Sequence, residues 1–129
     1  MATHKGSEGI VKISNNAVAE VTGFSFDETC DTIETTKLSD SARTYVTDLT
    51  AFSGTIDCFW DETDTNGQGA MTNGASVALD LFPEGATAGD TYFSCTALIT
   101  GISRANAIGS IVTASFSFQG TGAVTTSTV

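Results

Sequence analysis

The stretch Ile108-Gly-Ser-Ile-Val-Thr-Ala-Ser-Phe-Ser-Phe118 decides the fold class of this chain. Its even positions from Val112 to Phe118 are apolar, and the odd positions from Thr113 to Gln119 are polar. Successive side chains of a β-strand point to opposite faces of the sheet. The period of two therefore predicts a half-buried strand with one apolar face and one hydroxyl-bearing face.

The segment before it, residues 91–103, repeats the alternation, with Phe93, Cys95, Ala97 and Ile99 in one phase. Residues 104–107 separate the two runs, so the two strands are expected to form a hairpin. In residues 18–26 the apolar phase changes between Val21 and Phe24, which predicts a β-bulge at Gly23. Further strands are predicted over residues 10–14, 18–26, 52–60 and 77–82.

Two segments lack the strand period. Residues 27–50 contain turn-forming residues and scattered apolar ones, and we expect a long assembly loop there, because loops of this length are usually functional. Residues 63–75 carry Gln68, Ala70 and Met71 after Asp64, a side chain that can cap a short helix.

The length of 129 residues fits one domain. We expect a mainly β fold, a β-sandwich or half-barrel with one short flanking α-helix and a long inter-subunit loop. Residues 1–8 are expected to form a mobile N-terminal arm, and residues 123–129 a partly frayed C-terminal tail.

The charge balance limits the functions of the chain. Fifteen acidic and five basic residues give a formal net charge of −10, and 40% of the residues are apolar. A disordered chain combines high charge with low hydrophobicity, which is not the case here. A protein that binds nucleic acid tightly needs clustered cations. This chain has only Lys5, Lys12, Lys37, Arg43 and Arg104, so a nucleic-acid-binding function is not expected.

No apolar run is long enough for a signal peptide or a membrane span, so secretion by that route and a membrane location are not expected. The three cysteines, Cys30, Cys58 and Cys95, form no C-x-x-C pair, and we expect them to be small buried hydrophobes in a reducing compartment.

The residues needed for catalysis are scarce. The only histidine is His4, in the expected arm, so no histidine base is placed for a serine or cysteine nucleophile. No enzymatic activity, cofactor or metal is therefore predicted. Carboxylates could in principle hold calcium or cleave glycosides. They cluster at Asp27, Glu28, Asp31 and Glu34, and at Asp57, Asp61, Glu62 and Asp64.

With the strands placed, the order of motifs resembles the major tail protein, or tail tube protein, of long-tailed bacteriophages and related gene transfer particles. The motifs span roughly residues 9 to 122. They are Val18-Ala-Glu-Val21 with Phe24-Ser-Phe-Asp27, Asp31-Thr-Ile-Glu-Thr-Thr36, Arg43-Thr-Tyr-Val46 with Phe52-Ser-Gly-Thr-Ile56, Trp60-Asp-Glu-Thr-Asp64 with Gln68, and Phe116-Ser-Phe-Gln-Gly-Thr-Gly122.

The resemblance implies a structural virion protein that forms stacked hexameric rings, a hollow tube for DNA delivery into the host. Its implied partners are further copies of itself and other tail proteins, such as the tape measure, tail terminator and baseplate or distal tail protein. DNA would pass without specific binding, and the protein would be assembled in the host cytoplasm into the virion tail.

Physical chemistry suggests which residues serve such a tube. An acidic or hydroxylated wall offers DNA no counterion-release gain; we expect Asp57, Asp61 and Glu20 to face the lumen. Apolar side chains outside the monomer's core would bind neighbouring subunits. The assembly candidates are Ile33, Leu38, Arg43, Tyr45, Val46 and Leu49 in the long loop, and Phe59, an aromatic residue on the polar side of its strand.

Two alternatives remain at this point. One is an acidic β-sandwich that binds carbohydrate or calcium, and the other is a glycosidase built on the acidic clusters. Glu62-Thr-Asp-Thr-Asn-Gly67 resembles the first half of a calcium loop, but its twelfth position is Asn73 where a bidentate Glu is expected.

Overall fold

A computed structural model of the chain describes residue 5, residue 7 and residues 9–129. The predicted N-terminal arm, residues 1–8, lies mostly outside these residues. The elements are β1 (Ile10–Ile13), β2 (Asn16–Ala17), β3 (Val21–Glu34), β4 (Tyr45–Phe59), the one-turn 3-10 helix η2 (Gln68–Ala70), β5 (Ser76–Phe82), β6 (Thr91–Ala105) and β7 (Thr113–Thr128). The mainly β fold is confirmed.

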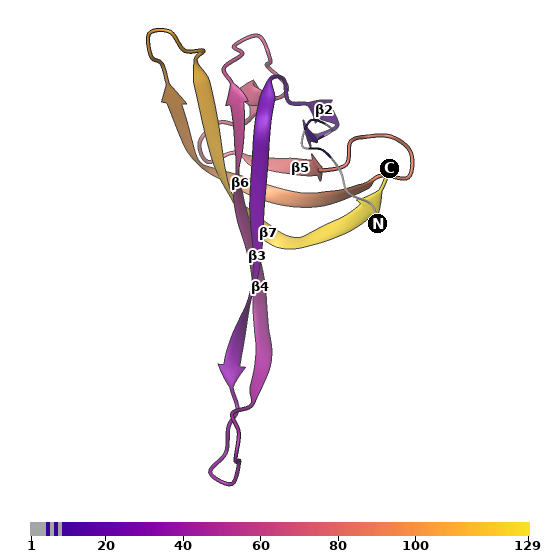
Figure 1. The fold of residues 1–129 in the computed structure, drawn as a ribbon, viewed down its shortest axis with the longest axis vertical. Helices are drawn as coiled ribbons and strands as arrows, with labels where there is room; N and C mark the ends of the chain where they lie inside the picture. Colours follow the sequence, from indigo (N-terminus) through magenta and orange to yellow (C-terminus); the bar gives the residue numbers. More distant parts are fainter. Residues whose placement is uncertain (1–4, 6, 8) are drawn as a thin grey trace.

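All seven strands belong to one antiparallel sheet in the order β2-β1-β5-β6-β7-β4-β3. The sheet is continuous, so the two separate sheets of a β-sandwich are not formed. It is strongly curved: β5, β6 and the end of β7 sweep sideways away from the upright β3–β4 pair (Figure 1). Register shifts in the β6–β7 ladder, between Ser94 and Thr96 and between Ile99 and Gly101, accompany this bend.

The core fills the concave side of the bent sheet. The alternation that predicted the strands decides which side chains enter it, since Phe116 is fully buried and Phe118 is 2% exposed. The rings of Phe26 on β3 and Phe93 on β6 pack edge to face, with their centroids 5.2 Å apart, and this contact joins the two halves of the sheet across the core. The buried cluster includes Val11, Ile13, Phe52, Ile56, Cys58, Met71, Val77, Leu79, Leu81, Cys95, Ala97, Ile99, Ala114, Phe116 and Phe118.

The predicted bulge is confirmed, because the β3–β4 register shifts between Val21 and Gly23. The predicted long loop over residues 27–50 is wrong. Both of its arms are strand, paired through Ile33 with Val46 and Glu34 with Tyr45, and only residues 35–44 connect them. Hydrogen bonds close this tip, including a backbone bond from Thr35 N to Thr44 O of 2.8 Å.

The predicted flanking α-helix is also wrong. The segment makes a single 3-10 turn, and the described residues contain no α-helix. Asp64 is not the N-cap of this turn, since that position is Gly67 and no side chain makes a cap hydrogen bond there. The Asp64 carboxylate nevertheless accepts hydrogen bonds from Gly67 N at 3.2 Å and Gln68 N at 3.0 Å. Gly67 at the N-cap and Gly69 within the turn disfavour a longer helix.

The C-terminal tail is ordered strand rather than a frayed end. β7 continues to Thr128, which pairs with Thr91 of β6. Val129 N then donates to Asp90 O at 2.8 Å. One cysteine also departs from expectation: Cys58 and Cys95 are buried, but Cys30 on β3 is exposed.

Candidate assembly surfaces

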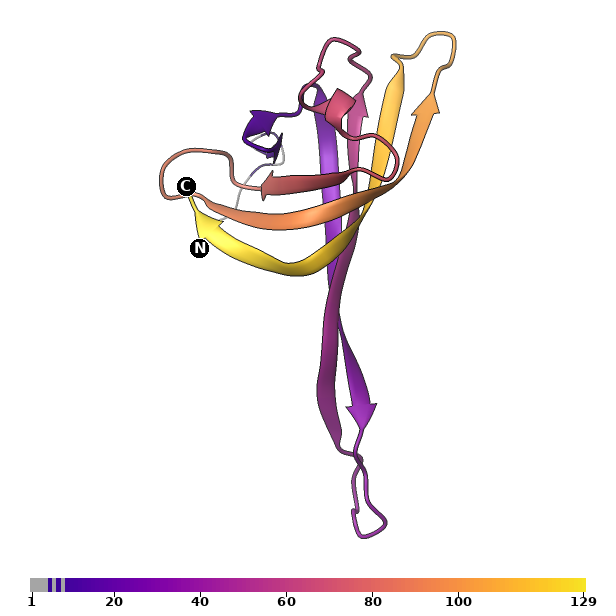
Figure 2. The same ribbon diagram turned by 180° about the vertical axis from the view of Figure 1, so that it is seen from behind.

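The β3–β4 hairpin projects far beyond the core as a narrow arm (Figures 1 and 2). It carries five exposed large apolar side chains: Leu38 (108% exposed), Leu49 (78%), Tyr45 (53%), Ile33 (50%) and Val46 (50%). Ile33 and Val46 lie opposite each other in the ladder and share one face, while Tyr45 points to the other face. Each face of the arm therefore carries apolar side chains that are uncovered in the monomer, between polar and acidic ones.

Arg43, the cation predicted for assembly, lies in the hairpin tip, residues 35–44. Its Nε is 3.9 Å from Glu34 Oε1, and both side chains are largely exposed. An exposed ion pair at this distance contributes little stability. Arg43 is therefore available to a partner.

Phe59, the other assembly candidate, is at the far end of β4 and is half-buried. Its backbone is fully engaged: Phe59 N donates to Glu20 O at 2.9 Å, and Phe59 O accepts from Gln68 Nε2 at 2.8 Å. Gln68 is only 3% exposed. Its Nε2 also donates to Ala19 O, and its Oε1 accepts a hydrogen bond from Asp61 N. Gln68 thus ties the 3-10 turn to both strand ends, a role that the sequence did not reveal.

The convex side of the same strands forms a second surface, which we name the hydroxyl face. Ladder pairing aligns Ser25 with Thr55, Thr55 with Ser117, and Ser103 with Ser115, so these side chains share one side of the sheet. Ser25 Oγ and Thr55 Oγ1 are 3.3 Å apart. The members of the hydroxyl face are Ser25, Asp27, Ser53, Thr55, Asp57, Ser103, Ser115 and Ser117.

No lysine or arginine belongs to the hydroxyl face. Lys12 lies on β1, with its Nζ 5.1 Å from the centre of the Phe82 ring. The Arg104 Cζ lies 4.8 Å from the centre of the Trp60 ring. Lys37 and Arg43 are in the hairpin tip. The face is thus anionic and hydroxylated, with no cation to attract phosphate.

Of the three predicted lumen carboxylates, Asp57 is the one that lies within the hydroxyl face. Asp57 is exposed on the hydroxyl face, where its Oδ1 accepts a 2.8 Å hydrogen bond from Ser115 Oγ. Asp61 lies beyond the end of β4; hydrogen bonds from the hydroxyl and N–H of Thr63 lower the pKa of its carboxyl. Glu20 is exposed in the turn before β3 and has a positive φ of 58°.

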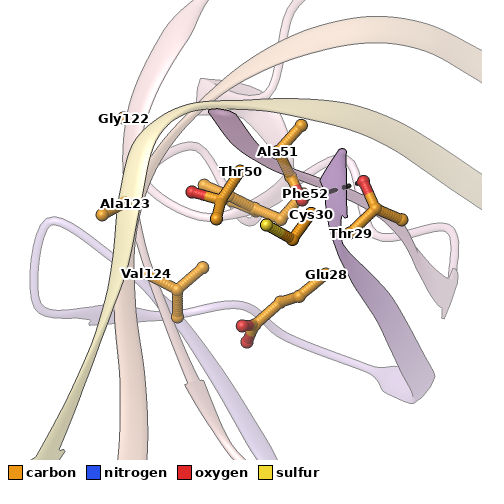
Figure 3. A pocket seen from close by; sticks show the side chains of 9 residues that line it. All are labelled: Glu28, Thr29, Cys30, Thr50, Ala51, Phe52, Gly122, Ala123 and Val124. Atoms are coloured by element: carbon orange, nitrogen blue, oxygen red, sulfur yellow. Dashed lines mark hydrogen bonds between the residues drawn. The ribbon is translucent and has the colours of Figure 1, made fainter. Parts of the chain in front are cut away.

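The sheet forks where β7 leaves β4. These strands pair only as far as Ser53 and Gln119, after which β4 continues into the arm and β7 turns away along β6. A pocket of about 260 Å³ opens in the fork (Figure 3), lined by Glu28, Thr29, Cys30, Thr50, Ala51, Phe52, Gly122, Ala123 and Val124. The fork depends on long-range pairing, and the only local signal for it is Gly120-Thr-Gly122 within a strand pattern.

The fork leaves backbone edges unpaired. Among the residues that the structure describes, the outer edge of β3 has no partner strand, and beyond the fork the facing edges of β4 and β7 are unpaired. Exposed edges are templates for pairing with another chain. These edges are therefore candidate joints between subunits.

The acidic clusters do not converge. Asp27 and Glu28 point to opposite faces of β3, and the Asp64 carboxylate is occupied by backbone N–H groups that donate to it. Within residues 5, 7 and 9–129 no group of three or more His, Cys, Asp or Glu side chains is arranged to hold a metal ion. None of the helices described is long and apolar enough to cross a membrane.

Comparison with known proteins gives structural matches alone. No protein-family model and no curated protein matches the chain. A chain from the tail of an empty gene transfer agent particle with C6 symmetry matches with a TM-score of 0.78 and 13% identity, over 97% of this chain and 99% of that one.

Two further structures agree. The SPP1 tail tube matches with a TM-score of 0.78 and 12% identity, over 98% of this chain and 80% of that one. A chain in the sheath-tube complex of an extracellular contractile injection system matches with a TM-score of 0.76 and 13% identity, over 98% of this chain and 93% of that one. The chain has the tail tube fold. This confirms the fold that the sequence motifs implied.

Proposed function

We propose that this chain is a structural subunit of a tail tube, which assembles into stacked hexameric rings in the virion tail and conducts DNA into the host. The single observation that carries the proposal is the match to tail and tail tube structures over nearly the whole chain. The role involves no catalysis. Assembly would take place in the host cytoplasm.

The hydroxyl face is proposed to line the lumen. DNA carries about one negative charge per 1.7 Å of axis, and a wall of Lys and Arg would hold it by releasing counterions. Asp57 and the surrounding hydroxyl groups offer no such gain. In this arrangement each curved sheet acts as the half-barrel expected from the sequence, with its convex side towards the channel, while Asp61 and Glu20 lie near the rim of the ring.

The ring is proposed to close through the sheet edges. The outer edge of β3 would pair with a free edge beyond the fork of the next subunit, so that no edge stays open. Phe59, half-buried at the end of β4, would be covered at this joint. Covering apolar surface stabilises the contact by about 25 cal/mol per Å².

The arm is proposed to reach the adjacent ring, because Ile33, Tyr45, Val46 and Leu49 have no cover within their own subunit. At its two ends the tube would meet other tail proteins, such as a tail terminator and a distal tail or baseplate protein, and a tape measure protein would occupy the channel before DNA does.

Electron microscopy of the purified full-length chain tests the proposal, combined with light scattering after size exclusion. The expected result is six-fold rings and tubes. A chain that stays monomeric at every concentration and salt condition, and that is absent from virion tails in lysate, would refute it.

A further inference from the structure

The connection between β6 and β7, residues 106–112, is an exposed apolar turn. It lies at the end of the molecule opposite the hairpin tip (Figures 1 and 2). Ile108 is 107% exposed and Ile111 is 64% exposed. Neighbouring apolar side chains that stand in solvent mark an interaction site more often than scattered ones do.

The turn is built to hold these side chains outward. Gly109 has a φ of +83°, a left-handed conformation that glycine adopts without strain. Ser110 N donates to Ala107 O at 3.1 Å and closes the turn. A shallow groove beside it is lined by Ala105, Asn106, Ala107, Ser110, Ile111 and Thr113.

Charge favours a second copy of this chain as the occupant. The groove carries no charged residue, since none occurs between Ala105 and Val129. Phe59 pairs with Thr113 and donates its N–H to Glu20 O at 2.9 Å, so the turns before β3 and after β4 lie at the same end of the molecule as the groove. These turns carry Glu20, Asp61 and Glu62, which outnumber the neighbouring cation Arg104. The hairpin tip at the other end presents Leu38, 108% exposed, and its two cations, Lys37 and Arg43, with the one acid Asp40 give it a formal net charge of +1.

We propose that the β6–β7 turn is the docking site for the hairpin tip of a second copy in the adjacent ring, with Leu38 seated against Ile108 and Ile111. This inference rests on the proposed function and adds the receiving surface to it. Because the two surfaces lie at opposite ends of one subunit, the contact is head-to-tail and repeats without closing. Stacking of rings would then use a different surface from ring closure.

The double variant Ile108→Ser/Ile111→Ser tests the docking site by electron microscopy. It is expected to form rings that do not stack, because both side chains are in solvent in the monomer and their loss leaves the fold intact. The control, Ala88→Ser in the exposed β5–β6 turn, should form tubes like the unchanged chain. Tubes of normal length and yield from the double variant would overturn the docking site while leaving the tube proposal standing; failure of the unchanged chain to form rings would overturn both.

Disulfide trapping identifies the occupant. In a Cys30→Ser background, Leu38→Cys and Ile111→Cys chains are mixed, assembled and oxidised; Cys58 and Cys95 are buried and do not interfere. A cross-linked dimer of the two different chains is expected, and none when Ala88→Cys replaces Ile111→Cys. Tubes that form without this cross-link, or with equal cross-linking in the control, would overturn the proposal.

Discussion

At Gly54 the sheet leaves no room for a side chain. A Cβ atom added there would collide with the backbone carbonyl of Ser25 and come within 2.7 Å of Phe26 Cα and 2.8 Å of Phe118 Cζ. Gly54→Ala is therefore expected to lower the free energy of unfolding by about 3 kcal/mol, the upper end of an overpacking penalty. Urea denaturation measures the change. Gly23→Ala is the control, because no atom lies within 4 Å of its added Cβ; an equal loss in both variants would contradict the close approach.

The three thiols are expected to differ in reactivity. Burial raises the pKa of Cys58 and of Cys95 to about 11, whereas Cys30 is exposed. Because the thiolate is the reactive form, a thiol reagent at neutral pH should modify Cys30 rapidly and the other two only after unfolding. Mass spectrometry of timed samples counts the adducts; rapid modification of Cys58 would contradict its burial.

The same pKa shifts have a defined sign for stability. Between the ordinary thiol pKa of 9.0 and the folded value of about 11, the unfolded chain loses thiol protons that the folded chain keeps. Stability is therefore lost as pH rises through this window. Replacing both buried thiols with alanine should reduce that loss, and melting temperatures across the window measure it.

Among the elements, the β3–β4 arm is expected to be dispensable for the monomer. Glu34 and Tyr45 lie opposite each other, so a two-residue Asn-Gly turn can replace residues 35–44 without changing the register. Because the core cluster contains no residue of the tip, the melting temperature of the monomer should hardly change. Stacking should fail in micrographs while rings persist; a large fall in melting temperature would show that the tip supports the fold.

The elements also show what sequence could and could not predict. The strands near Phe52–Phe59 and Thr113–Phe118 were predicted because one face is buried and the other is polar. The arm was mistaken for a loop because neither of its faces packs on the core, so no alternation is required of it. The predicted α-helix is only a 3-10 turn because Gly67 and Gly69 disfavour a longer helix. The fork and the hydroxyl face could not be predicted, because they arise from pairing between distant strands.

On the scale of the whole molecule, the anionic wall should be what keeps DNA from binding. Ser53 and Ser103 are exposed on the hydroxyl face, and Ser53→Lys/Ser103→Lys is expected to give assembled tubes a salt-sensitive affinity for duplex DNA. Fluorescence anisotropy of labelled DNA measures binding. The control Thr87→Lys/Ala88→Lys adds the same charge to exposed positions in the β5–β6 turn, outside the strands of the sheet. Equal binding by both variants, or binding by the unchanged tube, would contradict the proposed lining.

The arm also has a consequence for following assembly in time. Its backbone hydrogen bonds belong to a two-stranded ribbon in water, and such ribbons open readily on their own. Amide protons of residues 27–50 in the free subunit should therefore exchange with deuterium quickly, while those of the core strands exchange slowly. Once a neighbouring subunit covers the arm, the same amides should exchange slowly. A brief deuterium pulse would then report the fraction of polymerised subunits without a dye or tag attached to the protein.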